Sequence, residues 1–292
     1  MAKSKILKKI ETMHPKNDAW EIIRLTAYYE FPWDVIRGTE YALYKTYAVP
    51  SISKILYSTK EFVNNPQKRY DDTDLFISEI LEHGLHEGRG KQALERMNWI
   101  HSNYKISNDD YLYVLSTFLF DVYYWINNFG HRKLTSIEEL AGFYVWKEIG
   151  EQMHIQHIPD SIHAFLLFHD EYERKHFRYA ESNVKVAAAT EKIFLNMHFP
   201  KQLHDTIRPF LYAAMEPHLL KALHYEEPGL IKRKIVQSAL KARSSAEHIL
   251  PRNKPFIRTR DNKYKTYPNG YTLDDLGPDK LMKSSRCPFH KS

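Results

Sequence analysis

Cysteine and glycine are both scarce in this sequence of 292 residues. The single cysteine, Cys287, excludes a disulfide bond within the chain and a zinc site built from several cysteine thiolates. There are only 10 glycines, about half the number that ordinary usage gives. This scarcity argues against a nucleotide-binding fold with a glycine fingerprint, and against an all-β protein with many tight turns.

Long hydrophobic segments are also missing. The longest one runs from Tyr111 to Phe120 and ends at Asp121, whereas a membrane-spanning helix needs about 20 apolar residues. The N-terminal segment has no secretory hydrophobic region. We therefore expect no transmembrane segment and a cytoplasmic location.

The first residues form an amphipathic pattern. Ile6, Leu7 and Ile10 share one face of a predicted helix that also carries several lysines. Such a helix can make peripheral contact with a membrane surface, and a terminal helix docked on the protein body explains the pattern equally well. The net charge of +6 is mild for this length, so we expect no nucleic-acid partner.

Helical periodicity runs through nearly the whole chain. Hydrophobic residues make up 43% of the sequence and aromatic residues 14%, which suits a thick helical core or an enclosed apolar cavity. We predict a single all-α domain of about ten helices over residues 1–249, and an irregular, basic C-terminal arm over residues 250–292 that packs on the same domain. The predicted helices cover residues 3–13, 18–48 with a break at 31–32, 51–64, 71–83, 89–104, 107–130, 135–153, 161–177, 183–197, 200–225 and 228–249.

One of the 16 histidines, His101, stands out because of its neighbours. The residues that share a continuous helical face with it are Leu94, Met97 and Tyr104. We expect this face to point inward. A buried imidazole needs a partner, since an unpaired buried polar group costs on the order of 1–3 kcal/mol. The spacing leaves open whether the partner is a carbonyl group, a water molecule or a metal ion.

Arg69 and Thr73 form a second candidate site. They are four residues apart, so they meet on one face near the N-terminal end of a predicted helix. A guanidinium and a hydroxyl in this place suit an anionic group such as a carboxylate or a phosphate. The alternative is an arginine that caps the end of a neighbouring helix.

Several short motifs, in a fixed order, carry a resemblance to a known family. They are KRYDDTDLF (68–76), RMNWIH (96–101), ISNDDYLYVLSTF (106–118), WINNFGHRKLTSIEELA (125–141), WKEIGEQMHI (146–155), Tyr172-Glu173 and YTLDDLGP (271–278). Through them the chain resembles the oxygenase family of the mycophenolic acid pathway enzyme MpaB and the bacterial rubber oxygenases. The likeness extends over most of the chain and is closer to the MpaB side.

The resemblance implies an all-α fold that encloses a b-type haem. It also implies an enzyme that uses O2 to cleave a carbon–carbon double bond of an apolar, isoprenoid-like or polyprenyl substrate to carbonyl products. By motif position, His101 is the expected proximal haem ligand, and Arg69 and Thr73 are the expected cofactor-binding and catalytic residues of the haem pocket. Rubber oxygenases carry a lysine directly before that threonine, where this chain has Asp72.

Two other functions are compatible with the same residues. The absence of the lysine is also what a haem-binding electron-transfer or sensor protein without oxygenase activity would show. The third hypothesis is a helical interaction protein whose basic arm, around residues 252–265, binds an acidic partner or nucleic acid. The sequence makes no prediction of the oligomeric state.

Overall fold

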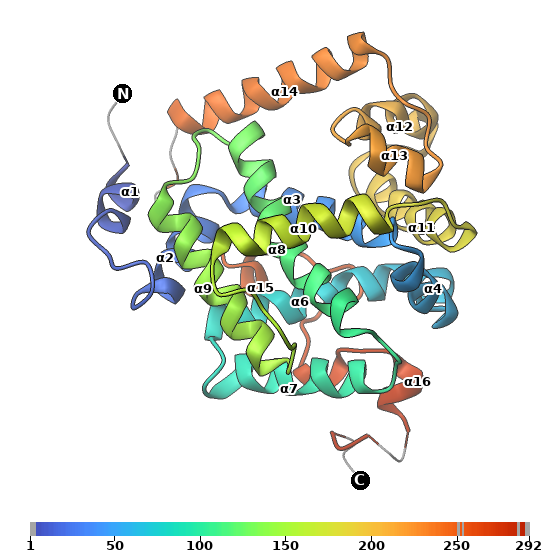
Figure 1. The fold of residues 1–292 in the computed structure, drawn as a ribbon. Helices are drawn as coiled ribbons and strands as arrows, with labels where there is room; N and C mark the ends of the chain where they lie inside the picture. Colours follow the sequence, from blue (N-terminus) through green and yellow to red (C-terminus); the bar gives the residue numbers. More distant parts are fainter. Residues whose placement is uncertain (1–3, 250–251, 253, 285–286, 290–292) are drawn as a thin grey trace.

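The computed structural model describes residues 4–249, 252, 254–284 and 287–289 (Figure 1). All regular structure within these ranges is helical, which confirms the predicted all-α class. The described residues form sixteen α-helices rather than about ten, because some predicted helices are divided and short helices lie between the long ones. The helices are α1 (Lys5–Ile10), α2 (Ala19–Leu25), α3 (Pro32–Tyr47), α4 (Pro50–Ser58), α5 (Glu61–Asn64), α6 (Pro66–His83), α7 (Gly88–Ser102), α8 (Asn108–Phe129), α9 (Ser136–Gln152), α10 (Ile162–His176), α11 (Glu181–His198), α12 (His204–Tyr212), α13 (Pro217–Leu223), α14 (Leu230–Ile249), α15 (Arg258–Asp261) and α16 (Asp279–Met282), with a π-helical segment η1 (Thr26–Glu30) and two 3₁₀ segments, η2 (Lys201–Leu203) and η3 (Leu273–Asp275).

Two helix starts follow directly from the local sequence. The Ser107 hydroxyl accepts a hydrogen bond from the backbone N–H of Asp110 and begins α8. Thr135 and Glu138 form a capping box at the start of α9, in which each side chain accepts a hydrogen bond from the backbone N–H of the other residue. These contacts satisfy backbone donors that have no partner inside the helix.

Some predicted boundaries are wrong for identifiable reasons. Helix α6 begins at Pro66 instead of residue 71, because proline suits the first turn, where its missing N–H costs nothing. The predicted helix over residues 51–64 is divided into α4 and α5, since Lys60 adopts a left-handed conformation with φ of 63°. The predicted helix over residues 200–225 is divided as well, because Pro217 begins a separate helix, α13.

The long helices pack in pairs around α3 and α8, which lie side by side in the middle of the bundle (Figure 1). Helix α6 packs on α7, α2 on α9 and α4 on α11. Helix α14 crosses one end of the molecule, at the top of Figure 1, and α7 lies near the opposite end. Residues of α3, α6, α7 and α8 line the cavity described below.

The N-terminal helix is docked on the protein body. Leu7 and Ile10 of α1 are 7% and 0% exposed, so its apolar face is already covered, which favours the docked alternative over membrane contact. No described helix combines the length and the apolar composition that crossing a membrane requires.

The described part of the C-terminal arm packs on α6 and α7. The Arg96 guanidinium donates a hydrogen bond to the Leu276 carbonyl at 2.9 Å, and the Tyr264 hydroxyl donates one to Asp74 at 2.7 Å. Two short helices, α15 and α16, interrupt the predicted irregular chain. Gly277 and Pro278 of this arm complete the wall of the cavity described next.

Candidate functional site

An apolar cavity of about 230 Å³ lies between the central helices. Its walls come from α3, α4, α6, α7, α8, α9 and α11, together with the C-terminal arm. The aliphatic and aromatic residues that line it include Leu43, Ile52, Phe76, Met97, Val114, Leu115, Phe118, Trp146, Ile149 and Ile193. Several polar side chains also line this space, but most of the wall surface is apolar, which is usual for a pocket that binds an apolar ligand or cofactor.

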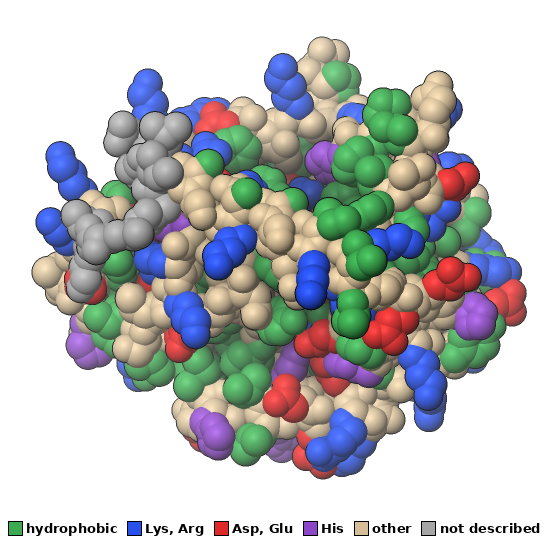
Figure 2. All heavy atoms as spheres, turned by 90° about the horizontal axis from the view of Figure 1, so that it is seen from above, with side chains coloured by type: hydrophobic (Ala, Val, Ile, Leu, Met, Phe, Trp, Pro, Cys, Tyr) green, Lys and Arg blue, Asp and Glu red, His purple; other side chains and the backbone are tan. Residues whose placement is uncertain are grey.

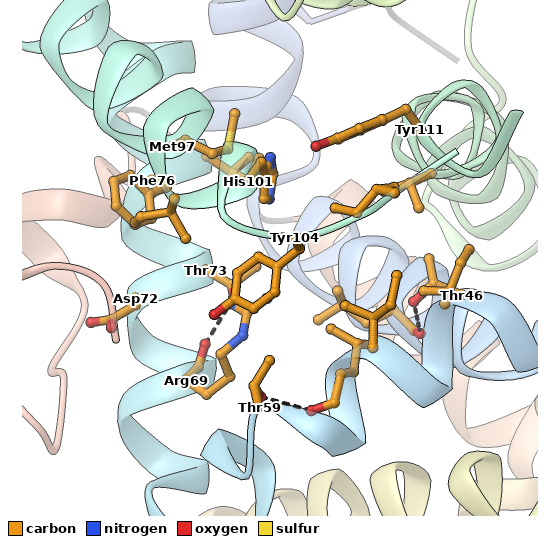
Figure 3. Close-up of a pocket in the computed structure, with 18 of the residues that line it drawn as sticks. Thr46, Thr59, Arg69, Asp72, Thr73, Phe76, Met97, His101, Tyr104 and Tyr111 are labelled. Carbon is orange, nitrogen blue, oxygen red and sulfur yellow. Dashed lines mark hydrogen bonds between the residues drawn. The ribbon is translucent and has the colours of Figure 1, made fainter. Parts of the chain in front are cut away.

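His101 faces this cavity from the last turn of α7 (Figure 3). Met97 and Tyr104 line the cavity beside it and Leu94 is buried, so the predicted inward face is confirmed. Neither ring nitrogen of His101 has a hydrogen-bond partner among the described residues, and Nδ1 is fully buried. Burial and the nearby Arg69 lower the pKa of His101 to about 4, so the imidazole is neutral at physiological pH.

Arg69 and Thr73 meet at the same cavity from α6 (Figure 3). The Thr73 hydroxyl donates a hydrogen bond to the Arg69 carbonyl at 2.8 Å, and the Arg69 guanidinium donates one to the Thr73 oxygen. The guanidinium also lies over the Phe62 ring, with 5.6 Å to the ring centroid. No described acidic side chain forms an ion pair with Arg69, so its charge is available to an anionic ligand.

The chemistry of these side chains suits a haem. A neutral imidazole with no hydrogen-bond partner among the described residues could ligate the iron, and the apolar walls would suit the macrocycle. A guanidinium that pairs with no described carboxylate would suit the haem propionates. The three residues predicted from the sequence thus line one cavity, although they come from two different helices, α6 and α7.

Asp72 stands where rubber oxygenases carry a lysine, and it has a structural role here. Its carboxylate accepts hydrogen bonds from Lys68 at 2.8 Å and from the Gly277 backbone N–H at 3.0 Å. Tyr267 donates a further hydrogen bond at 2.5 Å. Asp72 therefore fastens the C-terminal arm to α6 at the edge of the cavity.

A second, polar cavity of about 510 Å³ lies on another side of α8, and no sequence pattern predicted it. Lys45 is at its centre, with the ammonium nitrogen 2.9 Å from Asp121, 3.0 Å from Glu173 and 3.2 Å from Glu216. The ammonium group therefore already supplies a cation to these three carboxylates. Lys45 and Asp121 are 4% and 1% exposed.

Two histidines and a tyrosine complete this ion cluster around Glu173. The Nε2 atoms of His169 and His218 lie 3.1 and 3.2 Å from its two carboxylate oxygens, and the Tyr113 hydroxyl donates a hydrogen bond at 3.1 Å. Burial opposes ionisation, but the hydrogen bonds from the two histidines and the charge of Lys45 hold the pKa of Glu173 below its usual range. Burial raises the pKa of Asp121 to about 6.

The sequence contains one indication of this ion cluster, namely charged residues in apolar or aromatic surroundings, but helical periodicity does not show which residues pair. Asp121 directly follows the longest apolar run, and Lys45 lies in an aromatic-rich helix. A charged residue in such a place is buried only when it is paired. Nothing in the sequence identified the partner helices, because Lys45 and Glu173 are 128 residues apart.

Comparison with known proteins agrees with the resemblance in the motifs. No protein-family model matches the chain. The chain is 30% identical to the ER-bound oxygenase mpaB of Penicillium roqueforti (strain FM164), over 72% of this chain and 76% of that protein. It is 25% identical to the ER-bound oxygenase mpaB' of Penicillium brevicompactum, over 94% of this chain and 84% of that protein. It is 33% identical to the ER-bound oxygenase mpaB of Penicillium brevicompactum, over 47% of this chain and 37% of that protein.

These relatives are named oxygenases and share most of the chain, which supports an oxygenase and hence an oxidoreductase function. The resemblance drawn from the motifs is thereby confirmed at the level of the family. This chain belongs to the MpaB-like oxygenase family.

Proposed function

We propose that this protein is a haem b-dependent oxygenase that cleaves a carbon–carbon double bond of an apolar, isoprenoid-like substrate. The observation that supports this most directly is His101, a neutral imidazole on the wall of an apolar cavity that forms no hydrogen bond with any residue the structure describes. Membership in a family whose named members are oxygenases supports the reaction class.

His101 is the proposed proximal ligand, and Arg69 is the proposed partner of a haem propionate. Thr73 holds the guanidinium in place and adds a hydroxyl at the same point. The haem iron, when bound, activates O2. Both oxygen atoms end in the two carbonyl groups of the products, so the cleavage needs no external reductant.

The apolar walls have two proposed tasks. Side chains of α8, such as Val114 and Phe118, hold an isoprenoid chain by contact with its methyl groups. They also exclude water from the space where the reaction takes place. Because the proposed substrate is apolar and the relatives are named ER-bound, peripheral membrane contact is part of the proposal.

The first experiment measures the cofactor. Purified protein titrated with haemin is expected to gain a Soret band, and pyridine haemochrome analysis is expected to identify haem b. His101→Ala is expected to lose the band, whereas His83→Ala, at the end of α6 and outside the cavity, is expected to keep it. A protein that stays colourless after haem addition, or a His101→Ala variant with an unchanged spectrum, contradicts the proposal.

The second experiment measures the reaction. The haem-loaded protein is incubated with polyprenyl compounds while oxygen consumption is followed and carbonyl products are trapped. Oxygen uptake matched by carbonyl products supports the oxygenase. A bound haem with no product across a broad lipid panel favours the electron-transfer or sensor protein.

A further inference from the structure

The outer face of α14 carries the two most exposed large hydrophobic side chains in the described part of the chain. Leu230 and Ile231 are each 76% exposed, and Ile235, one turn further along, is 50% exposed. Large aliphatic side chains rarely remain this exposed in clusters without a binding partner. These side chains are exposed because α14 crosses one end of the bundle (Figure 1).

Helix α14 is anchored by two arginines on its inner face. Near its first turn, the Arg233 guanidinium donates a hydrogen bond to the Met215 carbonyl at 2.9 Å. Further along, Arg243 forms an ion pair with the buried Asp34 at 2.6 Å and lies over the Trp33 ring, 3.8 Å from its centroid. These contacts fix the rotation of the helix, so the same side of it always faces outward.

Lysines flank the aliphatic side chains on this outer face. Helical spacing places Ile231 and Ile235 at its centre, Lys232 on one flank, and Lys234 and Lys241 on the other. All three lysines are exposed, and none forms an ion pair with a described acidic side chain. Figure 2, which looks onto this end of the molecule, shows hydrophobic side chains interspersed with those of lysine and arginine.

We propose that this face of α14, formed by Leu230, Ile231, Lys232, Lys234, Ile235 and Lys241, docks on an anionic phospholipid bilayer. Aliphatic residues at the centre can enter the boundary between headgroups and acyl chains, while lysines on both flanks stay at the level of the lipid phosphates. The pattern favours a bilayer over a protein partner, because the aliphatic side chains are few and have lysines on both flanks. The inference names the surface for the peripheral contact proposed above, and haem binding does not depend on it.

The test is vesicle co-sedimentation of the haem-loaded protein. We expect binding to phosphatidylcholine vesicles that contain about one third phosphatidylserine, weaker binding in high salt, and little binding to phosphatidylcholine alone. Lys232→Gln/Lys234→Gln is expected to bind about 25-fold more weakly, from a factor of about five for each lysine. Ile231→Ser/Ile235→Ser is expected to lose more than a factor of about ten.

Val63→Ser is the matched control, since Val63 is 57% exposed but lies on α5, outside this surface. It is expected to bind vesicles like the unmodified protein. Absence of binding, equal binding to both vesicle types, or α14 variants that bind normally would overturn the inference. The Soret band of each variant separates the two proposals, because loss of docking with an intact band leaves the haem assignment standing.

Discussion

The two cavities on either side of α8 differ in whether their polar side chains have charged partners. In the apolar cavity, His101 and Arg69 have no acidic partner, and neither imidazole nitrogen of His101 accepts or donates a hydrogen bond within the described chain. In the polar cavity, Lys45 is surrounded by three carboxylates, and Glu173 is bonded from four sides. Charges that are paired with one another stabilise a fold, whereas buried polar groups that face a cavity without an acidic partner can bind a ligand.

The largest expected effect comes from removing the cation of the polar cavity. Lys45→Met leaves three carboxylates around an apolar side chain, and we expect unfolding free energy to fall by about 3–5 kcal/mol, the usual cost of uncompensated buried charge. Urea unfolding followed by circular dichroism measures it.

His101→Leu is the counterpart in the other cavity. It should leave the haem-free protein equally or more stable, because it removes a buried polar group that has no hydrogen-bond partner in the described part of the chain. If the two variants lost similar amounts of unfolding free energy, this result would contradict the distinction between the cavities.

The next effect concerns haem affinity. Arg69→Gln keeps a hydrogen-bond donor but removes the charge, so we expect haemin to bind about tenfold more weakly or worse, the usual value of a charge-assisted hydrogen bond. A haemin titration at the Soret band measures the change. Arg208→Gln, which changes an arginine outside the cavity, should titrate like the unmodified protein. Unchanged affinity in Arg69→Gln would mean that the guanidinium does not contact the cofactor.

The polar cavity also predicts a pH dependence of stability. The pKa of Glu173 is lower in the folded protein than in the unfolded chain, so its ionised form stabilises the fold above the unfolded pKa, and this contribution is lost as the pH falls. The stability difference between the unmodified protein and Glu173→Gln should therefore narrow by at least about 1.4 kcal/mol, one pKa unit, as the pH falls below about 4.3. Urea unfolding at several pH values measures it. A difference that stays constant would show that Glu173 titrates normally.

The smallest expected effect is that of Thr73→Val. This variant removes the hydroxyl that bonds the Arg69 carbonyl and guanidinium but keeps the size of the side chain. We expect a loss of about 1 kcal/mol in haem affinity, which is about fivefold in a haemin titration. A loss as large as that of Arg69→Gln would indicate that the hydroxyl itself contacts the cofactor.

Local features explain why part of the site could be predicted. His101 lies on the same helical face as Met97, and Arg69 meets Thr73 within one turn, so helical spacing alone brought each set together. The capping contacts of Ser107 and Thr135 are equally local. The start of α6 and the break at Lys60 were missed, because a proline in a first turn and a left-handed residue leave only weak traces in hydrophobic periodicity.

The sequence by itself determined the helical class, the main helix starts and the two candidate faces, since these depend on residues within a few turns of one another. Only the tertiary structure brought His101 and Arg69 to one cavity and closed it with Gly277 from the C-terminal arm. It alone paired Lys45 with Glu173 across 128 residues of chain, and it left the aliphatic face of α14 exposed while covering that of α1. The physical reason is that burial and charge pairing depend on which helices become neighbours, and hydrophobic spacing along one helix carries no record of its neighbour.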